Sequence, residues 1–450
     1  MKTRINMRLK KLLIIAGMLF ASIALGFLLL SACYLIPSGA QHDNLAKSAA
    51  ILSEEKTYQK ETYSNRSLDN FTDSLMLLES GYTIYDNAFV NAIRAPLYTI
   101  VANDLSPKKT LQAIAGEAQE ATGTIDYSRY WHGYQVILRP LLLIFDYGQI
   151  RQLNSVVFFF LSMLVVMMLL RQAPRCVIPF ILSFLLMSPT AIVDSLQYSV
   201  VSYITLFTMA SVLFSLNRDN DPEKVLYTFL FSGIAVAFFD LLTFPTVAMT
   251  LPLALFCSTT GSKQRTTALI LKCVVYWGIG YVGMWMGKWL IALAYGGKPY
   301  WDAIINSIRY RSGTEWKGEN AGRLTVLLYN IKELFRNHKL TICIVCYAVI
   351  STGAVFMNRN GITGKRVRTS LTLLVPALIP VCWIVIVANH SWNHTWFTYR
   401  TLAPCVFSLL CMLNISDISF GDKASKYKRH GDHPHKRQGR GTAGKAVNRA

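Results

Sequence analysis

Long apolar runs separated by short polar segments make up most of the chain beyond residue 153, and one further run lies near the N-terminus. Residues 12–32 contain no charged side chain. About 20 apolar residues in an α-helix cross the roughly 30 Å hydrocarbon core of a bilayer, since each residue rises 1.5 Å. Reading each run as a helix predicts ten membrane spans, near residues 12–33, 154–171, 176–193, 199–216, 224–239, 243–258, 268–292, 340–357, 370–388 and 401–418.

The pattern therefore predicts an all-α, polytopic integral membrane protein with a large outer segment after its first span. Its expected parts are a cytoplasmic N-terminus and first span (1–33), an extracytoplasmic segment (34–153), a multi-span domain (154–420), and a basic, disordered cytoplasmic tail (421–450). Within the outer segment, residues 134–147 are apolar but too few to cross a bilayer, and an aromatic residue stands at each end. Such a segment is typical of a helix lying on the membrane surface.

Charge supports this arrangement and excludes a nucleic-acid partner. Only 16% of the residues are charged, against roughly 25% in soluble domains. The formal net charge is +20, and the basic residues gather where the chain is expected to face the cytoplasm. Five precede the first span, and nine lie in 421–450 beside two aspartates. Basic flanks of this kind set membrane topology, and they predict that both termini are cytoplasmic.

The first polar cluster expected on the outer face is a pair of carboxylates, Asp69 and Asp73. Four residues apart, they share one face of a helix and repel each other. A bound cation, a metal ion or a substrate hydroxyl would compensate that repulsion. The alternative is structural, because an Asp or Asn before an apolar periodic run is ordinary helix-capping chemistry.

A second cluster runs from residue 129 to 139 and combines aromatic and basic side chains. It contains Tyr130, Trp131, His132 and Arg139. Aromatic rings at the membrane surface are typical of a sugar-binding shelf, and equally of a belt that anchors an interfacial helix. Both interpretations remain open at this point.

A third cluster, residues 389–400, contains His390, His394 and Arg400. The two histidines are four residues apart, but no third ligand stands beside them, and zinc catalysis needs three protein ligands. We therefore favour donors to a phosphate or a sugar over a metal site, and leave the use of a divalent cation open.

Further cations lie near the outer end of the seventh predicted span: Lys288, then Arg309 and Arg311 in the following loop. A lysine there either extends to the interface or meets a lipid phosphate. In the same span, residues 278–283 match the GxGxxG dinucleotide pattern by letter, but they lie in an apolar helix without a preceding strand. No nucleotide site is expected, and the glycines predict close helix packing.

This layout resembles the GT-C class of membrane glycosyltransferases, in which one span precedes a large outer segment with catalytic acids and surface helices. Residues 129–140 are also similar to uncharacterised bacterial membrane proteins of cell-surface polysaccharide gene clusters. The resemblance implies a bacterial plasma membrane location and assigns catalysis to Asp69 and Asp73. Asp43 is an alternative, because it lies nearer the first span, where that class usually has its key acid. The resemblance assigns the lipid phosphate to Lys288, Arg309, Arg311 or Arg400.

The implied activity is inverting transfer of a sugar from a polyprenyl-phosphate-linked donor to a cell-surface glycan or lipid acceptor on the outer face. A carboxylate would act as general base, basic side chains would stabilise the departing phosphate, and Tyr130, Trp131 and Tyr134 would stack on the sugar. The alternative from another class is a transporter, flippase or polymerase of lipid-linked oligosaccharide. A transporter is expected to carry inverted repeats and ionisable residues at mid-span, and neither is evident in the sequence.

Overall fold

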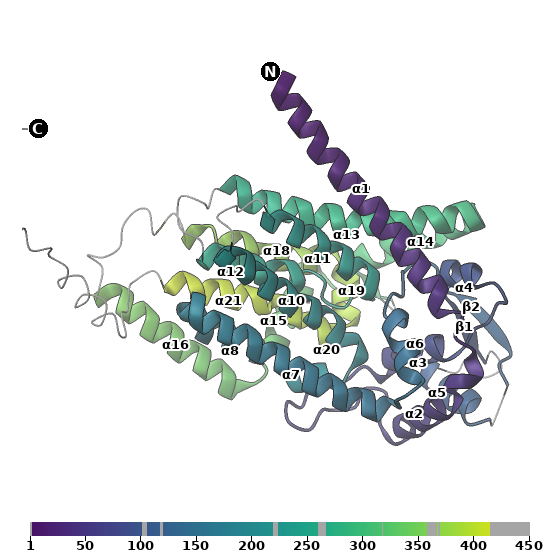
Figure 1. Ribbon diagram of the computed structural model, residues 1–450. Helices are drawn as coiled ribbons and strands as arrows, with labels where there is room; N and C mark the ends of the chain where they lie inside the picture. The colour runs from purple at the N-terminus through teal and green to yellow at the C-terminus, as the bar shows by residue number, and fades with distance from the viewer. Residues whose placement is uncertain are drawn as a thin grey trace, which may run out of the picture.

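The computed structural model describes residues 2–100, 106–117, 120–218, 224–259, 267–316, 318–357, 367 and 370–414 (Figure 1). Within these residues the chain is almost entirely helical, as predicted, and its four strands form two short antiparallel pairs. Strands β1 and β2 pair from Pro96 opposite Asp126 to Thr99 opposite Gly123. The predicted tail and most of the predicted cytoplasmic loops lie outside the described residues.

The first span and the outer segment contain α1 (Lys2–Cys33), η1 (Ser38–Gln41), α2 (His42–Glu54), α3 (Asn70–Gly81), α4 (Ala88–Arg94), β1 (Pro96–Thr99), α5 (Pro107–Ala115), β2 (Gly123–Asp126) and α6 (Gln135–Leu142). The middle of the chain contains α7 (Tyr147–Gln172), η3 (Pro174–Cys176), α8 (Val177–Leu186), α9 (Pro189–Val193), α10 (Leu196–Arg218), α11 (Lys224–Phe239), α12 (Val247–Thr259) and α13 (Thr267–Gly296). The last third contains α14 (Lys298–Ser312), β3 (Glu315–Trp316), β4 (Glu319–Asn320), α15 (Arg323–Leu334), α16 (His338–Met357), α18 (Leu374–Ile386), α19 (Ala388–Asn393), α20 (Thr395–Thr398), η5 (Tyr399–Leu402) and α21 (Ala403–Leu413).

Each of the ten apolar runs is helical over most of its length. Six described helical segments are long and apolar enough to cross a membrane: Leu9–Cys33, Tyr147–Gln172, Leu196–Ser215, Thr267–Gly296, His338–Met357 and Thr395–Leu413. Four shorter apolar segments are Pro174–Leu186, Lys224–Phe239, Val247–Thr259 and Leu374–Ile386. The polytopic helical class is therefore supported, and the count of ten spans stays a prediction.

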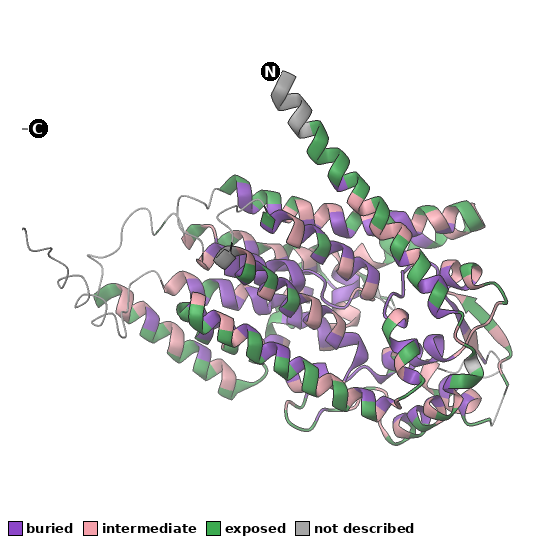
Figure 2. Ribbon diagram, viewed as in Figure 1, coloured by how far each residue is buried: buried purple, intermediate pink, exposed green. Residues whose placement is uncertain are grey.

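Large apolar side chains are exposed along the outer surfaces of the long helices. Figure 2 shows much of α1 and α16 exposed, and Phe20 and Leu12 of α1 and Ile350 and Val349 of α16 are more than three-fifths exposed. Apolar surface of this extent is unusual on a soluble monomer. It is the expected surface of helices that face lipid hydrocarbon.

Helices α11 and α13 approach each other most closely where two glycines cross. A Cβ added to Gly233 would lie 2.2 Å from the carbonyl oxygen of Trp277, and one added to Gly280 would lie 2.2 Å from that of Leu230. Neither backbone tolerates a side chain at these points. The expectation that glycines of the seventh span serve close helix packing is confirmed for Gly280 but not for Gly278, where an added Cβ would have no atom within 4 Å.

The described residues between 34 and 146 pack around a second apolar core, in which Leu45, Leu77, Leu111 and Leu142 are fully buried. Tyr147 and Ile150 of α7 and Leu196 of α10 also belong to this core. The expected surface helix 134–147 is shorter than predicted, because α6 covers only Gln135–Leu142. Helix α7 begins at Tyr147 rather than at 154, because Asp146 caps it. The Asp146 carboxylate accepts the backbone N–H of Gln149, and the Gln149 side chain accepts that of Asp146, each at 3.0 Å.

Candidate functional site

Asp69 lies at the start of α3, where the sequence Asp-Asn-Phe-Thr-Asp turns from an extended loop into helix. Its carboxylate accepts the backbone N–H of Thr72 at 3.1 Å, which is the N-cap hydrogen bond. The structural alternative for this residue is therefore correct as far as it goes. The side chain is only 2% exposed, so the cap is made by a buried carboxylate.

Asp73, one turn later, joins the outer segment to α10. Its carboxylate accepts the Tyr147 hydroxyl at 2.6 Å and the backbone N–H groups of Leu196 and Gln197 at 3.0 and 3.1 Å. The Ser195 hydroxyl adds a further donor at 3.2 Å. Both oxygens are thus engaged at the N-terminus of α10, where the helix dipole favours negative charge. This placement gives Asp73 a structural role.

Asp69 has a different environment. Burial raises the pKa of its carboxyl group to about 6, and the charge of Asp73 acts in the same direction against the hydrogen bond from Thr72. The Trp396 indole lies close enough to this carboxyl to lower its pKa slightly, although its Nε1 atom makes no hydrogen bond among the described residues. The ring of Tyr58 packs against that indole with centroids 4.9 Å apart. Among the described residues, Asp69 has no ion-pair partner. It is a buried carboxyl that titrates near neutrality beside two aromatic rings.

His394 continues this cluster on the other side of Trp396. Its ring lies 5.1 Å from the Trp396 ring and stacks on Phe397 at 5.1 Å. Burial, followed by the charge of Arg311, lowers the pKa of His394 to about 4, so its imidazole is neutral. The buried Nδ1 atom has no hydrogen-bond partner among the described residues.

His390 holds Arg311 in a fixed orientation. The Nε2 atom lies 2.7 Å from the carbonyl oxygen of Leu242 and must donate to it, so Nδ1 is left to accept. The Arg311 guanidinium donates to Nδ1 at 2.8 Å. Burial, together with the positive charge of Arg311, lowers the pKa of His390 well below its usual range, which keeps this imidazole neutral.

Arg311 itself remains available to a ligand. It lies over the ring of Tyr130, 5.5 Å from the ring centroid, and donates to the Ser307 hydroxyl at 3.3 Å. Within the part of the chain that the structure describes, no carboxylate pairs with it, and its side chain is partly exposed. A half-buried, oriented guanidinium without an anionic partner is the usual arrangement for binding phosphate or carboxylate.

Of the second cluster, only Tyr130 belongs to this site. The Trp131 indole donates to the carbonyl oxygen of Met284 at 2.7 Å, and its side chain is buried. His132 lies 2.8 Å from the carboxylate of Glu79 with both ring nitrogens engaged inside the protein. Arg139 is fully buried and donates to the carbonyl oxygens of Cys33 and Tyr82 and to the Thr83 hydroxyl.

The other predicted phosphate ligands occupy different positions. The Lys288 ammonium is buried and donates to the carbonyl oxygens of Ala92 and Ile93 at 2.7 and 2.8 Å. Arg400 is buried, donates to the carbonyl oxygen of Met187 at 2.7 Å and lies over the Tyr198 ring. These contacts stabilise the fold. Arg309 is exposed in the last turn of α14, and Asp43 is exposed in the first turn of α2.

Asp240 and Tyr58 are additions to the predicted site. Burial raises the pKa of the Asp240 carboxyl to about 7, while its hydrogen bonds from Thr243 act against that rise. Burial raises the pKa of the Tyr130 hydroxyl, and the negative charge of Asp240 adds to that rise. The Tyr130 ring lies beneath Arg311. The Asp240 side chain accepts the backbone N–H of Thr243 in the turn that follows α11, which is ordinary turn chemistry for an aspartate at the end of a helix. Nothing in the sequence around Tyr58 marks it, because its place is set by the distant Trp396.

Among the described residues, no group of three or more His, Cys, Asp or Glu side chains is arranged to hold a metal ion. No protein-family model, curated protein or solved structure matches the chain. The site is therefore interpreted from its own chemistry. It combines one oriented cation, one carboxyl that titrates near pH 6, a neutral histidine and several aromatic faces, contributed by both the outer segment and the last third of the chain.

Proposed function

We propose that the protein is a membrane glycosyltransferase of the GT-C type. It transfers a sugar from a polyprenyl-phosphate-linked donor to a cell-surface glycan or lipid acceptor on the outer face of a bacterial plasma membrane. The observation that carries this proposal is the continuous cluster from Asp69 through Trp396, His394 and His390 to Arg311. This cluster joins a buried carboxyl group to a guanidinium that has no carboxylate partner among the described residues, and such a guanidinium would suit a phosphate.

The chemistry divides between these two groups. The ionised Asp69 carboxylate takes the proton from an acceptor hydroxyl as its oxygen forms a bond to the anomeric carbon. The bond from that carbon to the phosphate oxygen breaks in the same step, with inversion, and the electron pair leaves with the polyprenyl phosphate. Arg311 stabilises the negative charge that grows on this phosphate. A carboxyl with a pKa of about 6 suits a general base near neutral pH.

The remaining residues position these groups. His390 fixes the guanidinium of Arg311 through its unprotonated Nδ1. The rings of Tyr58, Trp396 and Tyr130 offer apolar faces on which a sugar ring stacks. No nucleotide is required, because the donor is a lipid-linked sugar, and a divalent cation has no ligand set among the described residues.

The decisive experiment measures sugar transfer by purified protein in detergent, with a polyprenyl-phosphate sugar as donor and no second compartment. Asp69→Asn keeps a capping side chain but removes the base, and a reduction of about 10²–10⁴ in rate is expected. Asp146→Asn is the matched control, because Asp146 also caps a helix and is expected to retain activity. Equal activity in both variants would reduce Asp69 to a helix cap. Donor binding without product across several acceptors would favour the flippase.

A further inference from the structure

Buried polar atoms without a hydrogen-bond partner gather in the segment that joins α18 to α21. Among the described residues, five such atoms belong to residues 391–400: Oγ of Ser391, Oδ1 of Asn393, Nδ1 of His394, Nε1 of Trp396 and Nη2 of Arg400. A buried polar atom without a partner is costly, and native proteins contain few of them. Their concentration beside the candidate site indicates a ligand that supplies the missing partners.

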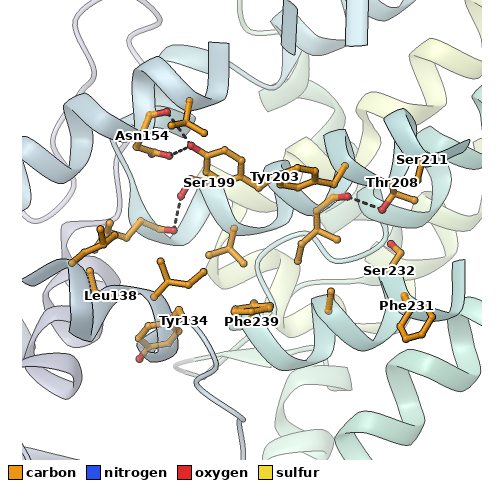
Figure 3. A pocket seen from close by; sticks show the side chains of 18 of the residues that line it. Tyr134, Leu138, Asn154, Ser199, Tyr203, Thr208, Ser211, Phe231, Ser232 and Phe239 are labelled. Atoms are coloured by element: carbon orange, nitrogen blue, oxygen red, sulfur yellow. Dashed lines mark hydrogen bonds between the residues drawn. The ribbon is translucent and has the colours of Figure 1, made fainter. Parts of the chain in front are cut away.

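The apolar pocket along α10 provides a comparison, because several of its polar groups are satisfied by the protein itself. The Tyr203 hydroxyl donates to the Asn154 side chain at 2.6 Å (Figure 3). The hydroxyls of Ser199 and Thr208 donate to carbonyl oxygens of their own helix at 2.9 and 2.6 Å. These side chains have little to offer a polar ligand. The side chains of Trp396 and His394 differ from them in this respect.

Trp396 and His394 together define the chemistry of the group that would satisfy them. Their ring centroids lie 5.1 Å apart. An indole N–H can only donate, whereas Nδ1 of the neutral His394 imidazole accepts or donates according to its tautomer. A hydroxyl group both donates and accepts, so one hydroxyl satisfies both residues in either tautomer. A carboxylate would satisfy the indole, but the nearby Asp69 would repel it.

The position of these two residues assigns the hydroxyl to one of the two substrates. The Trp396 indole is close to the Asp69 carboxyl. Arg311 lies toward the other end of the cluster, where it is held by His390, whose ring centroid is 4.8 Å from that of His394. The proposed reaction brings the acceptor to Asp69 and the donor phosphate to Arg311. A hydroxyl bound by Trp396 and His394 therefore belongs to the acceptor.

The acceptor must then carry a second hydroxyl near the one that reacts. Hydroxyl groups on adjacent carbons are close enough for one to reach Asp69 while the next reaches Trp396 and His394. The ring of Tyr58 packs on Trp396 with centroids 4.9 Å apart and is 46% exposed, so an acceptor can approach this end of the site from outside the protein. The two aromatic faces also suit the apolar face of a sugar ring.

We propose that Trp396 and His394 determine acceptor specificity by binding a hydroxyl group on the carbon next to the reacting one. The acceptor is then a sugar or another vicinal polyol. A lipid alcohol or an amino-acid side chain with a single hydroxyl lacks the second group and is a poor acceptor. This inference rests on the proposed function, since it names which acceptors the same site takes. The transfer step is unchanged, and the second hydroxyl does not react.

Three substitutions alter the hydroxyl-binding atoms, and a fourth is their control. Trp396→Phe keeps an aromatic ring but removes the N–H. His394→Asn keeps a polar atom at the position of Nδ1, whereas His394→Gln moves the polar atoms to the position of Nε2. Trp392→Phe makes the same change as Trp396→Phe on α19, where the Trp392 ring packs against Tyr329. Thermal unfolding in detergent establishes that the variants are folded.

The acceptor probes are two cyclohexanediols of equal size, one with its hydroxyls on adjacent carbons and one with them on opposite carbons. Purified full-length protein in detergent receives each diol with a polyprenyl-phosphate sugar. Saturation-transfer NMR measures binding of each diol without the donor. For the unsubstituted protein, kcat/KM is expected to be about tenfold or more higher for the adjacent diol.

The variants are expected to divide according to the atoms they keep. Trp396→Phe and His394→Gln should lose the preference for the adjacent diol, mainly through a higher acceptor KM, with the donor KM unchanged. His394→Asn and Trp392→Phe should keep most of it. A donor KM that rises together with the acceptor KM would show a general disturbance of the site and count against the proposal.

The outcomes separate this inference from the proposed function. Equal transfer to both diols by the unsubstituted protein would overturn the inference and leave the transfer reaction standing, and it needs no variant to be folded. A preference that survives in both Trp396→Phe and His394→Gln would do the same. Preferential binding of the adjacent diol without sugar transfer to any acceptor would support the hydroxyl site and overturn the proposed function. Neither binding nor transfer of either diol would overturn both.

Discussion

Asp69 and Asp73 stand one helical turn apart at the start of α3, and burial raises the pKa of both carboxyl groups, but the two receive different numbers of hydrogen bonds. Asp73 receives hydrogen bonds from the N-terminus of α10 and from Tyr147, which act against the rise in its pKa that burial causes. Asp69 receives one backbone hydrogen bond and the repulsion of its neighbour. The hydrogen bonds to Asp73 offset part of the repulsion expected from the spacing, and Asp69 is left with the less favourable environment for a negative charge.

This difference predicts a pH-dependent effect of Asp69→Asn on stability. The folded-state pKa of Asp69 is about 6, above the ordinary 3.8 of an unfolded chain, so its contribution to stability is present at low pH and lost as the pH rises through 6. The neutral amide avoids that loss, which corresponds to roughly 3 kcal/mol. Thermal unfolding in detergent is expected to show the variant more stable at pH 8 than the unsubstituted protein, with the difference shrinking below pH 6.

Asp146→Asn again provides the comparison, since Asp146 is a partly exposed cap of α7. If Asp69→Asn were equally destabilised at every pH, the Asp69 carboxyl would have the same pKa in the folded and unfolded chain, as a simple cap without the effect of burial would. A stabilised but inactive variant would be typical of a catalytic group held in an unfavourable environment.

The chemistry of individual residues could be anticipated from the sequence more readily than their partners. The sequence predicts that the segments containing Asp69, Tyr130, His390 and His394 lie on one side of a membrane. In the structure these residues form one connected cluster. The roles of buried cations could not be anticipated. Lys288 is satisfied by the carbonyl oxygens of Ala92 and Ile93, almost 200 residues away in the chain. A lysine at the end of a span has the same local sequence whether it binds a phosphate or a carbonyl oxygen.

At the level of helices, the hydrophobic runs correctly predict where helices occur, but they predict the first and last residues of those helices less accurately. All ten runs are helical over most of the residues that the structure describes, because an apolar segment of that length satisfies its backbone hydrogen bonds within itself. The apolar pattern predicts that α7 starts at residue 154, seven residues after its true start at Tyr147. The first two turns of α7 contain several polar residues, so they are not part of the apolar run. The Asp146 capping box is the local signal that marks the true start.

The crossing of α11 and α13 makes a sharp prediction for two glycines on one helix. Gly280→Leu brings a Cβ to within 2.2 Å of the Leu230 carbonyl oxygen, so it is expected to separate the helices and prevent accumulation of folded protein. Gly278→Leu, two residues earlier, has no atom within 4 Å of the added Cβ and is expected to fold normally. Yield of monodisperse protein in detergent, followed by thermal unfolding, measures both. Normal folding of Gly280→Leu would show that α11 and α13 are not packed through this contact.

For the whole molecule, the predicted side of the membrane for each connecting segment depends on whether the four shorter apolar helices also cross the membrane. Tyr130 of the outer segment contacts Arg311, and Arg311 lies in the segment after α13. Leu242 lies in the segment after α11 and contacts His390, which lies in the segment after α18. The segment after α1 and the segments after α11, α13 and α18 therefore meet at one end of the bundle. Crossing by the six long helices alone would place the segment after α13 on the side opposite the outer segment. The contacts thus favour end-to-end passage by the four shorter helices too.

Reporter fusions along the chain test this argument. Ten spans with a cytoplasmic N-terminus place Gly261, Asn358 and Ala450 in the cytoplasm, in agreement with the basic flanks, and place Thr110, Gly318 and Asn393 outside. The informative positions are Gly261 and Gly318. With six spans alone, Gly261 would lie outside and Gly318 inside, whereas Ala450 would be cytoplasmic under either count.

We expect cytoplasmic reporter activity at Gly261 and external activity at Gly318, because the Arg311–Tyr130 contact requires α14 and the outer segment to share one side. A phosphatase active only outside and a fluorescent protein that fluoresces only in the cytoplasm should give opposite results at each position. The reverse pattern at Gly261 and Gly318 would separate Arg311 from Asp69 by the membrane. It would contradict both the arrangement of the bundle and the outer-face site that the proposed transfer reaction needs.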